Sequence, residues 1–140
     1  MNRILLFGTF ILLFSCKESL IPKENLHYLN GYWEISEVTF PDGSKKDYKI
    51  SSTIDFIHLD GDSGFRKKMQ PKFNGTYSTS NNVESFTMIK TNDVFTLTYK
   101  NSLDQWDEKL IQLDSTSFAV RNEEGILYSY KRFQPIQIPK

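Results

Sequence analysis

The chain has 140 residues, the size of a single domain, and its 17 Lys and Arg residues are matched by 17 Asp and Glu residues. A net charge of zero lacks the basic surplus of a nucleic-acid-binding protein, and a single cysteine excludes an intrachain disulfide. Aromatic residues make up 14% of the chain, and together with frequent Asn, Asp, Gly and Ser they favour strands joined by turns.

Residues 1–15 have the layout of a secretory signal peptide. Arg3 gives a short positive start, residues 4–14 are apolar, and Ser15 is the small residue at the end. A transmembrane helix needs roughly 20 apolar residues. This run is shorter and is followed by charge at Lys17, so we expect a signal peptide that is removed rather than a membrane span.

The only cysteine, Cys16, directly follows this segment. The string Leu13-Phe14-Ser15-Cys16 resembles the lipobox of bacterial lipoproteins, in which Leu stands three positions before the cysteine and a small residue stands just before it. The resemblance implies export, cleavage before Cys16 and attachment of a diacylglyceryl group to its sulfur, with fatty-acyl chains such as palmitate. One acyl chain binds membranes only marginally, and lipoproteins of this kind typically carry three.

The same resemblance implies a place in the cell envelope. Residues 16–24 would be the lipidated cysteine and a tether, residues 25–134 the folded domain, and residues 135–140 a tail. Lys17 stands where inner-membrane lipoproteins of enterobacteria carry Asp, so we expect the outer membrane. Acylation of Cys16 would leave no thiol for a disulfide, a metal site or a nucleophile.

A short helix and a first group of strands follow in chain order. Residues 22–30 predict the helix, with Pro22 near its first turn and Gly31 just past its end. Strands are expected at residues 32–40, 47–59, 73–79 and 83–90. The basic groups at residues 45–46 and 66–68 are interpreted as solvated, turn-like segments.

The second half of the chain continues the same pattern. Strands are expected at residues 94–100, 106–113, 117–121 and 126–133, and the clearest hairpin turns at residues 91–93. About eight strands with short connections and no long helix argue against a parallel sheet. The predicted fold class is therefore all-β, an antiparallel up-and-down meander that closes into a barrel and so removes its edges. A flattened β-sandwich is the alternative.

Two short motifs relate the predicted barrel to a known family. Gly31-Tyr32-Trp33 opens the first strand, and Arg132 lies in the last one. Lipocalins begin their first strand with Gly-x-Trp and pack an Arg of the last strand across that Trp, so the chain resembles the lipocalin-like domains of small Bacteroidetes lipoproteins. The resemblance implies that Trp33 and Arg132 form a structural pair at one end of the barrel. A guanidinium over an indole stabilises by roughly 0.5–2 kcal/mol.

The predicted barrel suggests a binding function. An eight-stranded barrel is just wide enough to hold one small ligand, and apolar side chains that alternate along the strands could line a pocket for a hydrophobic molecule. These candidates are Tyr48, Phe56, Phe86, Met88, Phe95, Leu97, Tyr99, Phe118 and Tyr128. The same side chains could instead fill the interior, which would favour a structural or protein-interaction module of the envelope.

Catalytic and metal-binding patterns are sparse. An enzyme would require His58 in an open cleft beside an acid such as Asp55 or Asp60. The spacing of Asp60, Asp62 and Gly64 is similar to the start of a calcium loop, but turn chemistry explains it equally well. We expect a non-catalytic monomer without a metal or cofactor that binds no nucleic acid and reaches the membrane through its lipid.

Overall fold

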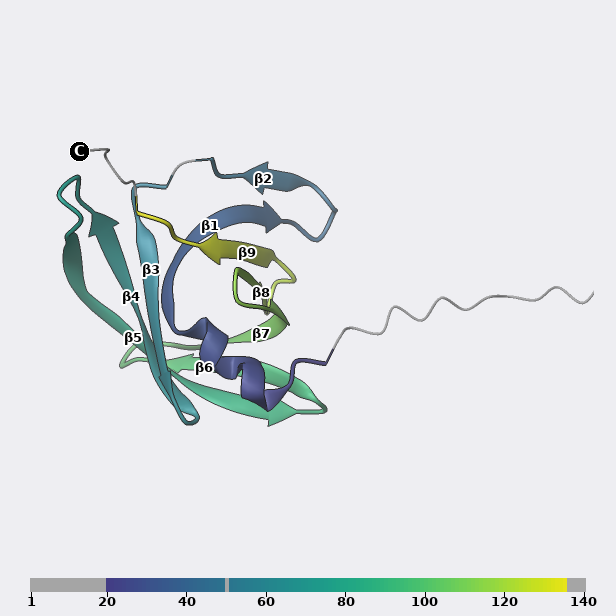
Figure 1. Ribbon diagram of the computed structural model, residues 1–140. Coiled ribbons are helices and arrows are strands. Elements are labelled where there is room, and N and C mark those ends of the chain that lie inside the picture. The colour runs from purple at the N-terminus through teal and green to yellow at the C-terminus, as the bar shows by residue number, and fades with distance from the viewer. Residues whose placement is uncertain (1–19, 50, 136–140) are drawn as a thin grey trace, which may run out of the picture.

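The computed structural model describes residues 20–49 and 51–135; the predicted signal peptide, Cys16 and most of the predicted tail lie outside the described residues. A short 3-10 helix, η1 (Lys23–Leu29), precedes the strands (Figure 1). The strands of the described part are β1 (Gly31–Thr39), β2 (Lys45–Asp47), β3 (Ile54–Asp60), β4 (Ser63–Pro71), β5 (Tyr77–Thr91), β6 (Val94–Lys100), β7 (Gln105–Leu113), β8 (Ser117–Asn122) and β9 (Leu127–Arg132).

The strands form one antiparallel sheet that closes on itself. From β3 to β9 each strand pairs with the next in sequence, β1 pairs with β3, and β1 also pairs with β9 to complete the ring. β2 pairs with the end of β1 and stands outside the ring (Figure 1). The predicted all-β, up-and-down antiparallel barrel is therefore confirmed, and the alternative of a flattened sandwich is not adopted.

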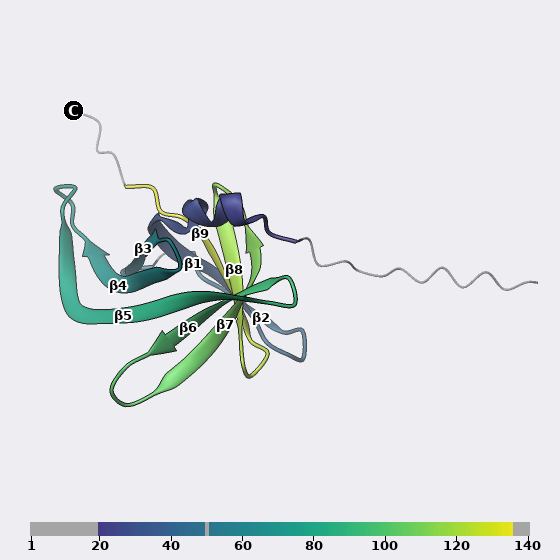
Figure 2. The same ribbon diagram turned by 90° about the horizontal axis from the view of Figure 1, so that it is seen from below.

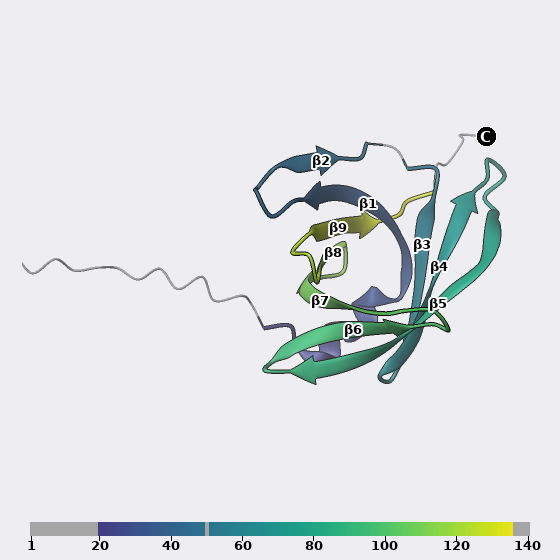
Figure 3. The same ribbon diagram turned by 180° about the vertical axis from the view of Figure 1, so that it is seen from behind.

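The helix η1 lies at one end of the barrel, on the side where the described chain begins (Figures 1 and 3). Pro22 precedes it with an extended backbone, and Leu26 and Leu29 bury their side chains in the hydrophobic core. The short helix predicted from residues 22–30 is thus present. The buried hydrophobic residues of the described chain all fall between Leu26 and Tyr130, so a chain that starts at Lys17 retains each of them.

Strand boundaries differ from the sequence prediction in two places. The predicted strand at residues 47–59 is interrupted, because the chain leaves β2 and re-enters the sheet only at Ile54. The predicted strands at residues 73–79 and 83–90 belong to one strand, β5, whose 15 residues pass through a shift in register opposite β4; Figure 2 shows it as a long, bent strand.

The strand β4 was missed altogether. Its basic residues 66–68 were expected in a solvated turn, but the segment pairs with both β3 and β5. Alternation sends Arg66 into the barrel and Lys67 outward, and Arg66 is 7% exposed. Burial of Arg66 depends on carboxylates from other strands, which local sequence does not reveal.

Within residues 20–49 and 51–135, no helix has both the length and the apolar character needed to cross a membrane.

Candidate functional site

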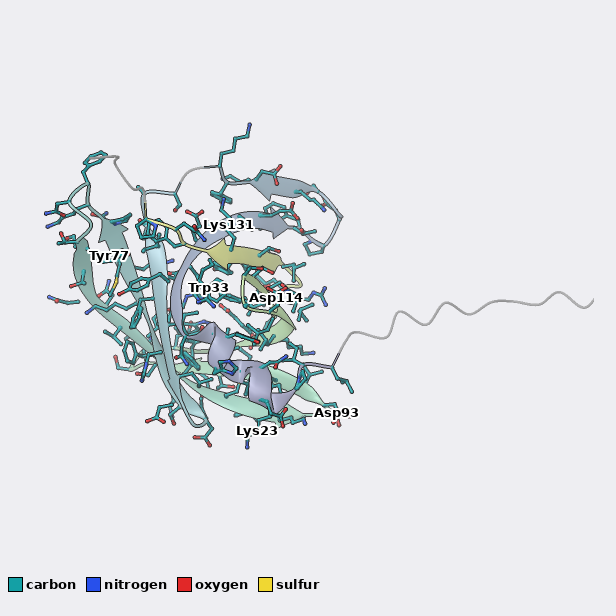
Figure 4. All side chains as sticks on the ribbon, viewed as in Figure 1. Lys23, Trp33, Tyr77, Asp93, Asp114 and Lys131 are labelled. Atoms are coloured by element: carbon teal, nitrogen blue, oxygen red, sulfur yellow. The ribbon has the colours of Figure 1, made fainter. Side chains whose placement is uncertain are left out.

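Most of the predicted lining residues meet inside the barrel. Phe86, Met88, Phe95, Leu97, Tyr99 and Phe118 belong to the buried core, and half-buried Tyr128 packs against it. Trp33 lies within the ring of strands (Figure 4), edge-on to Phe118 with ring centroids 4.7 Å apart. Phe118 also stacks on Tyr130 at 4.6 Å. These contacts show a packed aromatic interior.

Two predicted lining residues lie elsewhere. Phe56 is on the outer face, because β3 turns Asp55 and Ile57 inward and Phe56 and His58 to the opposite side. Its ring centroid is 4.9 Å from that of Tyr32, which also faces outward on β1. Tyr48 follows β2 outside the ring, and its backbone N–H donates to the Ser36 carbonyl at 2.9 Å. Alternation with a period of two shows which residues of a strand share a face. It does not show which of the two faces turns toward the barrel interior.

A charged cluster lies inside the barrel among these rings. Arg66 Nη2 donates to Asp55 Oδ2 at 2.8 Å, and Lys68 Nζ lies 2.8 Å from Asp55 Oδ1. The other guanidinium nitrogen, Nη1, is 3.8 Å from Glu108 Oε2. The guanidinium carbon lies 4.9 Å from the centroid of the Tyr130 ring. The buried cation is therefore held between carboxylates and the face of an aromatic ring.

The two carboxylates of the cluster have opposite pKa shifts. Burial alone would raise the pKa of Asp55, but the charges and hydrogen bonds of Arg66 and Lys68 outweigh it and hold that pKa below its ordinary value. Burial raises the pKa of Glu108 by more than Arg66 lowers it. Glu108 Oε2 is buried and has no hydrogen-bond donor among the described residues. Asp55 is thus well compensated as an anion, and Glu108 is not.

The structure brings Trp33 and Arg132 together at the helix end of the barrel. The guanidinium carbon lies 3.7 Å from the indole ring centroid. Arg132 Nη1 donates to the Asn30 carbonyl at 2.7 Å and Nη2 to the Tyr28 carbonyl at 2.8 Å. Trp33 Nε1 donates to the Leu29 carbonyl at 2.8 Å. The pair thus links the end of η1 to the first and last strands.

The residues of the enzyme alternative do not assemble into a site. His58 is exposed on the outer face of β3, and Asp55 faces the interior three residues earlier. Asp60 ends β3 opposite Ser63 at the hairpin. No cluster of three or more metal-binding side chains occurs among the described residues.

A cavity of about 300 Å³ lies on the outside of the barrel, between the β4–β5 turn and the segment after β9. Sequence reasoning did not identify it, because it joins four segments far apart in the chain. Its lining residues are Glu34, Lys49, Ser51, Pro71, Lys72, Phe73, Gly75, Thr76, Tyr77, Phe133, Gln134 and Pro135. A second surface hollow of about 370 Å³ lies over strands β5 to β8 and is lined mainly by Thr and charged residues.

The first cavity borders a row of aromatic rings on the outer face. Tyr77, on the β4–β5 side of the molecule in Figure 4, stacks on Tyr32 with ring centroids 4.8 Å apart and planes 8° apart. Phe133 lies edge-on to Tyr77 at 6.4 Å. Phe56 continues the row on the far side of Tyr32. The cavity therefore has a firm aromatic wall that the barrel itself supports.

Comparison with protein families supports the resemblance to lipocalin-like domains. The sequence profile of a family described as "Lipocalin-like domain" matches residues 29–120, about two thirds of the chain. The chain belongs to this family. The match of this lipocalin-like domain begins just before Trp33 and ends before β9, so Arg132 lies beyond it.

Solved structures similar to this lipocalin-like domain include apocrustacyanin C1, with 11% identity and a TM-score of 0.48, and lobster apocrustacyanin A1, with 11% identity and a TM-score of 0.46. The alignments cover 79% of this chain and 64% and 63% of those chains, respectively. No curated protein matches the lipocalin-like domain significantly by sequence.

Proposed function

We propose that the protein is a non-catalytic binding module of the cell envelope, anchored by lipid on Cys16, which takes a small hydrophobic ligand in the cavity outside its barrel. The observation that carries the ligand part is the cavity of about 300 Å³ with its aromatic wall. That volume is at the lower end of the range of small-molecule sites. The interior, in contrast, holds side chains that are already packed on one another.

The anchor part rests on the lipobox-like string at residues 13–16. With a tether up to residue 24, the domain would stay close to the surface of the outer membrane, where amphiphilic molecules are concentrated. The expected test is incorporation of labelled palmitate by the full chain in a bacterial host. Labelling and membrane fractionation should both be lost with Cys16→Ser. A Cys16→Ser protein that stays in the membrane fraction would contradict the anchor.

Native mass spectrometry of residues 17–140, after exposure to an extract of the source envelope, tests the ligand part. We expect a discrete bound mass of a few hundred daltons that is lost with Tyr77→Ala and Phe133→Ala. The control Phe40→Ala, at an exposed aromatic residue outside the cavity, should retain it. A mass lost with Leu97→Trp and retained with Tyr77→Ala would place the ligand inside the barrel instead.

A second candidate is a structural or protein-interaction module. The filled interior favours it, together with the exposed apolar side chains Phe73 and Leu103, which are 92% and 94% exposed. This reading predicts bare protein in the mass spectrum and a specific protein that cross-links to the outer face. The two candidates thus differ in one measurement.

A further inference from the structure

The outer cavity has a charge as well as an apolar wall. Lys49 and Lys72 both line it, and neither has an ion-pair partner among the described residues. The one acidic residue in the lining, Glu34, already pairs with Lys131, whose Nζ lies 3.1 Å from Glu34 Oε1. The cavity rim therefore carries two uncompensated positive charges.

Two hydroxyl groups of the lining are engaged within the chain. Thr76 Oγ1 donates to Asn74 Oδ1 at 2.6 Å, and Ser51 Oγ donates to the Thr53 carbonyl at 2.6 Å. Each hydroxyl hydrogen is donated to a neighbouring residue of the same turn. The two lysine ammonium groups are the charged hydrogen-bond donors at the rim, and charged donors form stronger hydrogen bonds than neutral ones.

The turn that carries Lys72 is pre-formed. Lys72 N donates to the Thr76 carbonyl at 2.8 Å, Gly75 N donates back to the Lys72 carbonyl at 3.1 Å, and Asn74 Oδ1 accepts from Thr76 N at 3.1 Å. Gly75 has φ +81°, which the turn requires and which side-chain-bearing residues rarely adopt. This turn holds Phe73 at the cavity edge, 92% exposed, so its ring has apolar surface left to cover a ligand.

From this arrangement we infer that the cavity selects a small amphipathic anion: a molecule with an aromatic or aliphatic body and one carboxylate, sulfonate or phosphate group. The body lies against Tyr77 and Phe133 under Phe73, and the anionic group meets Lys49 and Lys72. This inference rests on the proposed function, because it names the ligand class of the same cavity. The occupant is a free small molecule rather than a membrane lipid.

Two fluorescent probes with the same body test the charge separately from the apolar cavity. 8-Anilinonaphthalene-1-sulfonate carries one negative charge, and N-phenyl-1-naphthylamine is its neutral counterpart. Titrated into residues 17–140 at low salt, the sulfonate should bind about tenfold more tightly than the neutral probe, and the difference should shrink as salt screens the lysines. Tyr77→Ala should lower the affinity of the protein for both probes.

Lysine variants provide the matched comparison. The double variant Lys49→Gln with Lys72→Gln should reduce the affinity for the sulfonate to that for the neutral probe. Its affinity for the neutral probe should not change. Lys23→Gln with Lys100→Gln removes the same charge from exposed positions outside the cavity and should change neither affinity. Thermal melts of each variant verify that folding is intact.

The possible failures are distinct. Equal affinities of the two probes, both lost with Tyr77→Ala, would keep the hydrophobic site and overturn its selectivity for anions. Absence of binding by both probes would overturn the proposed cavity itself. If binding occurs only after removal of residues 136–140, the chain's own tail occupies the cavity and the inference is wrong. Selective binding to phosphatidylglycerol vesicles, without free-probe binding, would assign the lysines to a membrane surface.

Discussion

Arg66 of β4 and Asp55 of β3 form a 2.8 Å ion pair inside the barrel, and both side chains are less than a tenth exposed. A guanidinium in such a place is costly unless its charge is balanced and its donors are used. Asp55 provides that balance from the neighbouring strand, and Lys68 adds a second positive charge beside the same carboxylate. The pair therefore fixes how β3 and β4 face the interior.

Removing one member of this pair should be severe. Asp55→Asn leaves Arg66 buried beside a neutral amide, and we expect the free energy of unfolding at pH 7 to fall by about 3–5 kcal/mol. Urea denaturation of residues 17–140 measures it. The control Asp60→Asn, an exposed acid at the end of the same strand, should change stability by less than about 0.5 kcal/mol.

The double variant Asp55→Leu with Arg66→Met separates charge balance from packing. Replacing a whole buried ion pair with apolar side chains is often neutral or stabilising. We expect the double variant to recover most of the loss of Asp55→Asn. A double variant as unstable as the single one would show that Asp55 acts through packing, not through the charge of Arg66.

The pH dependence of stability should differ in sign between the two interior carboxylates. The folded-state pKa of Asp55 is lowered, so its contribution is present above its ordinary pKa near 4 and is lost as pH falls through the lower folded value. The folded-state pKa of Glu108 is raised, so its ionised form costs stability above that pKa, and the cost disappears as pH falls through it.

Glu108→Gln should therefore stabilise the protein by about 1 kcal/mol at pH 7, because the buried Oε2 no longer carries a charge. The gain should vanish at low pH, where Glu108 itself is neutral. Asp55→Asn should destabilise at pH 7, and its stability should begin to approach that of wild type only below about pH 4, as pH falls toward the lowered folded pKa of Asp55. Urea midpoints at several pH values measure both trends. A Glu108→Gln protein less stable than wild type at pH 7 would contradict the raised pKa.

At the helix end of the barrel, Arg132→Lys should cost about 2 kcal/mol. A lysine keeps the charge but cannot lie flat on Trp33 while donating to the carbonyls of Tyr28 and Asn30. Lys131→Gln, next in sequence and half-exposed, is the control and should change stability little. Thermal melts of the two variants give the comparison. Equal melting temperatures would contradict a structural role for Trp33 and Arg132.

The architecture was predictable from sequence because it depends on local signals. The hairpin at residues 91–93 follows from turn residues that tolerate positive φ, and Asn92 and Asp93 do adopt φ of 50° and 64°. The motif Gly31-Tyr32-Trp33 and Arg132 predicted that Trp33 and Arg132 meet at one end of the barrel, and the two side chains are in contact there. Such features need only neighbouring residues or one known motif.

The candidate site was less predictable because it depends on contacts between strands. The alternation in β3 was recognised, but its inward face was assigned to Phe56 instead of Asp55, since a charged residue inside a barrel contradicts the ordinary pattern. Arg66 and Lys68, on a strand that was not recognised, make that placement stable. The outer cavity joins residues from 34 to 135, and no periodicity along the chain signals such a meeting.

Gly64, at the start of β4, is a further position where neighbouring strands decide the residue type. A Cβ there would lie 2.5 Å from both the His58 carbonyl oxygen and Phe86 Cζ. Phe86 belongs to the packed core and has no room to retreat, so Gly64→Ala should destabilise the protein by about 2 kcal/mol or more. Gly61→Ala, in the adjoining turn, meets no atom within 4 Å, although its φ of +63° adds backbone strain.

Gly64→Ala with Phe86→Leu should recover part of the loss, which urea denaturation would reveal. No recovery in the double variant would mean that the clash with the His58 backbone, not the Phe86 ring, makes glycine necessary at this position.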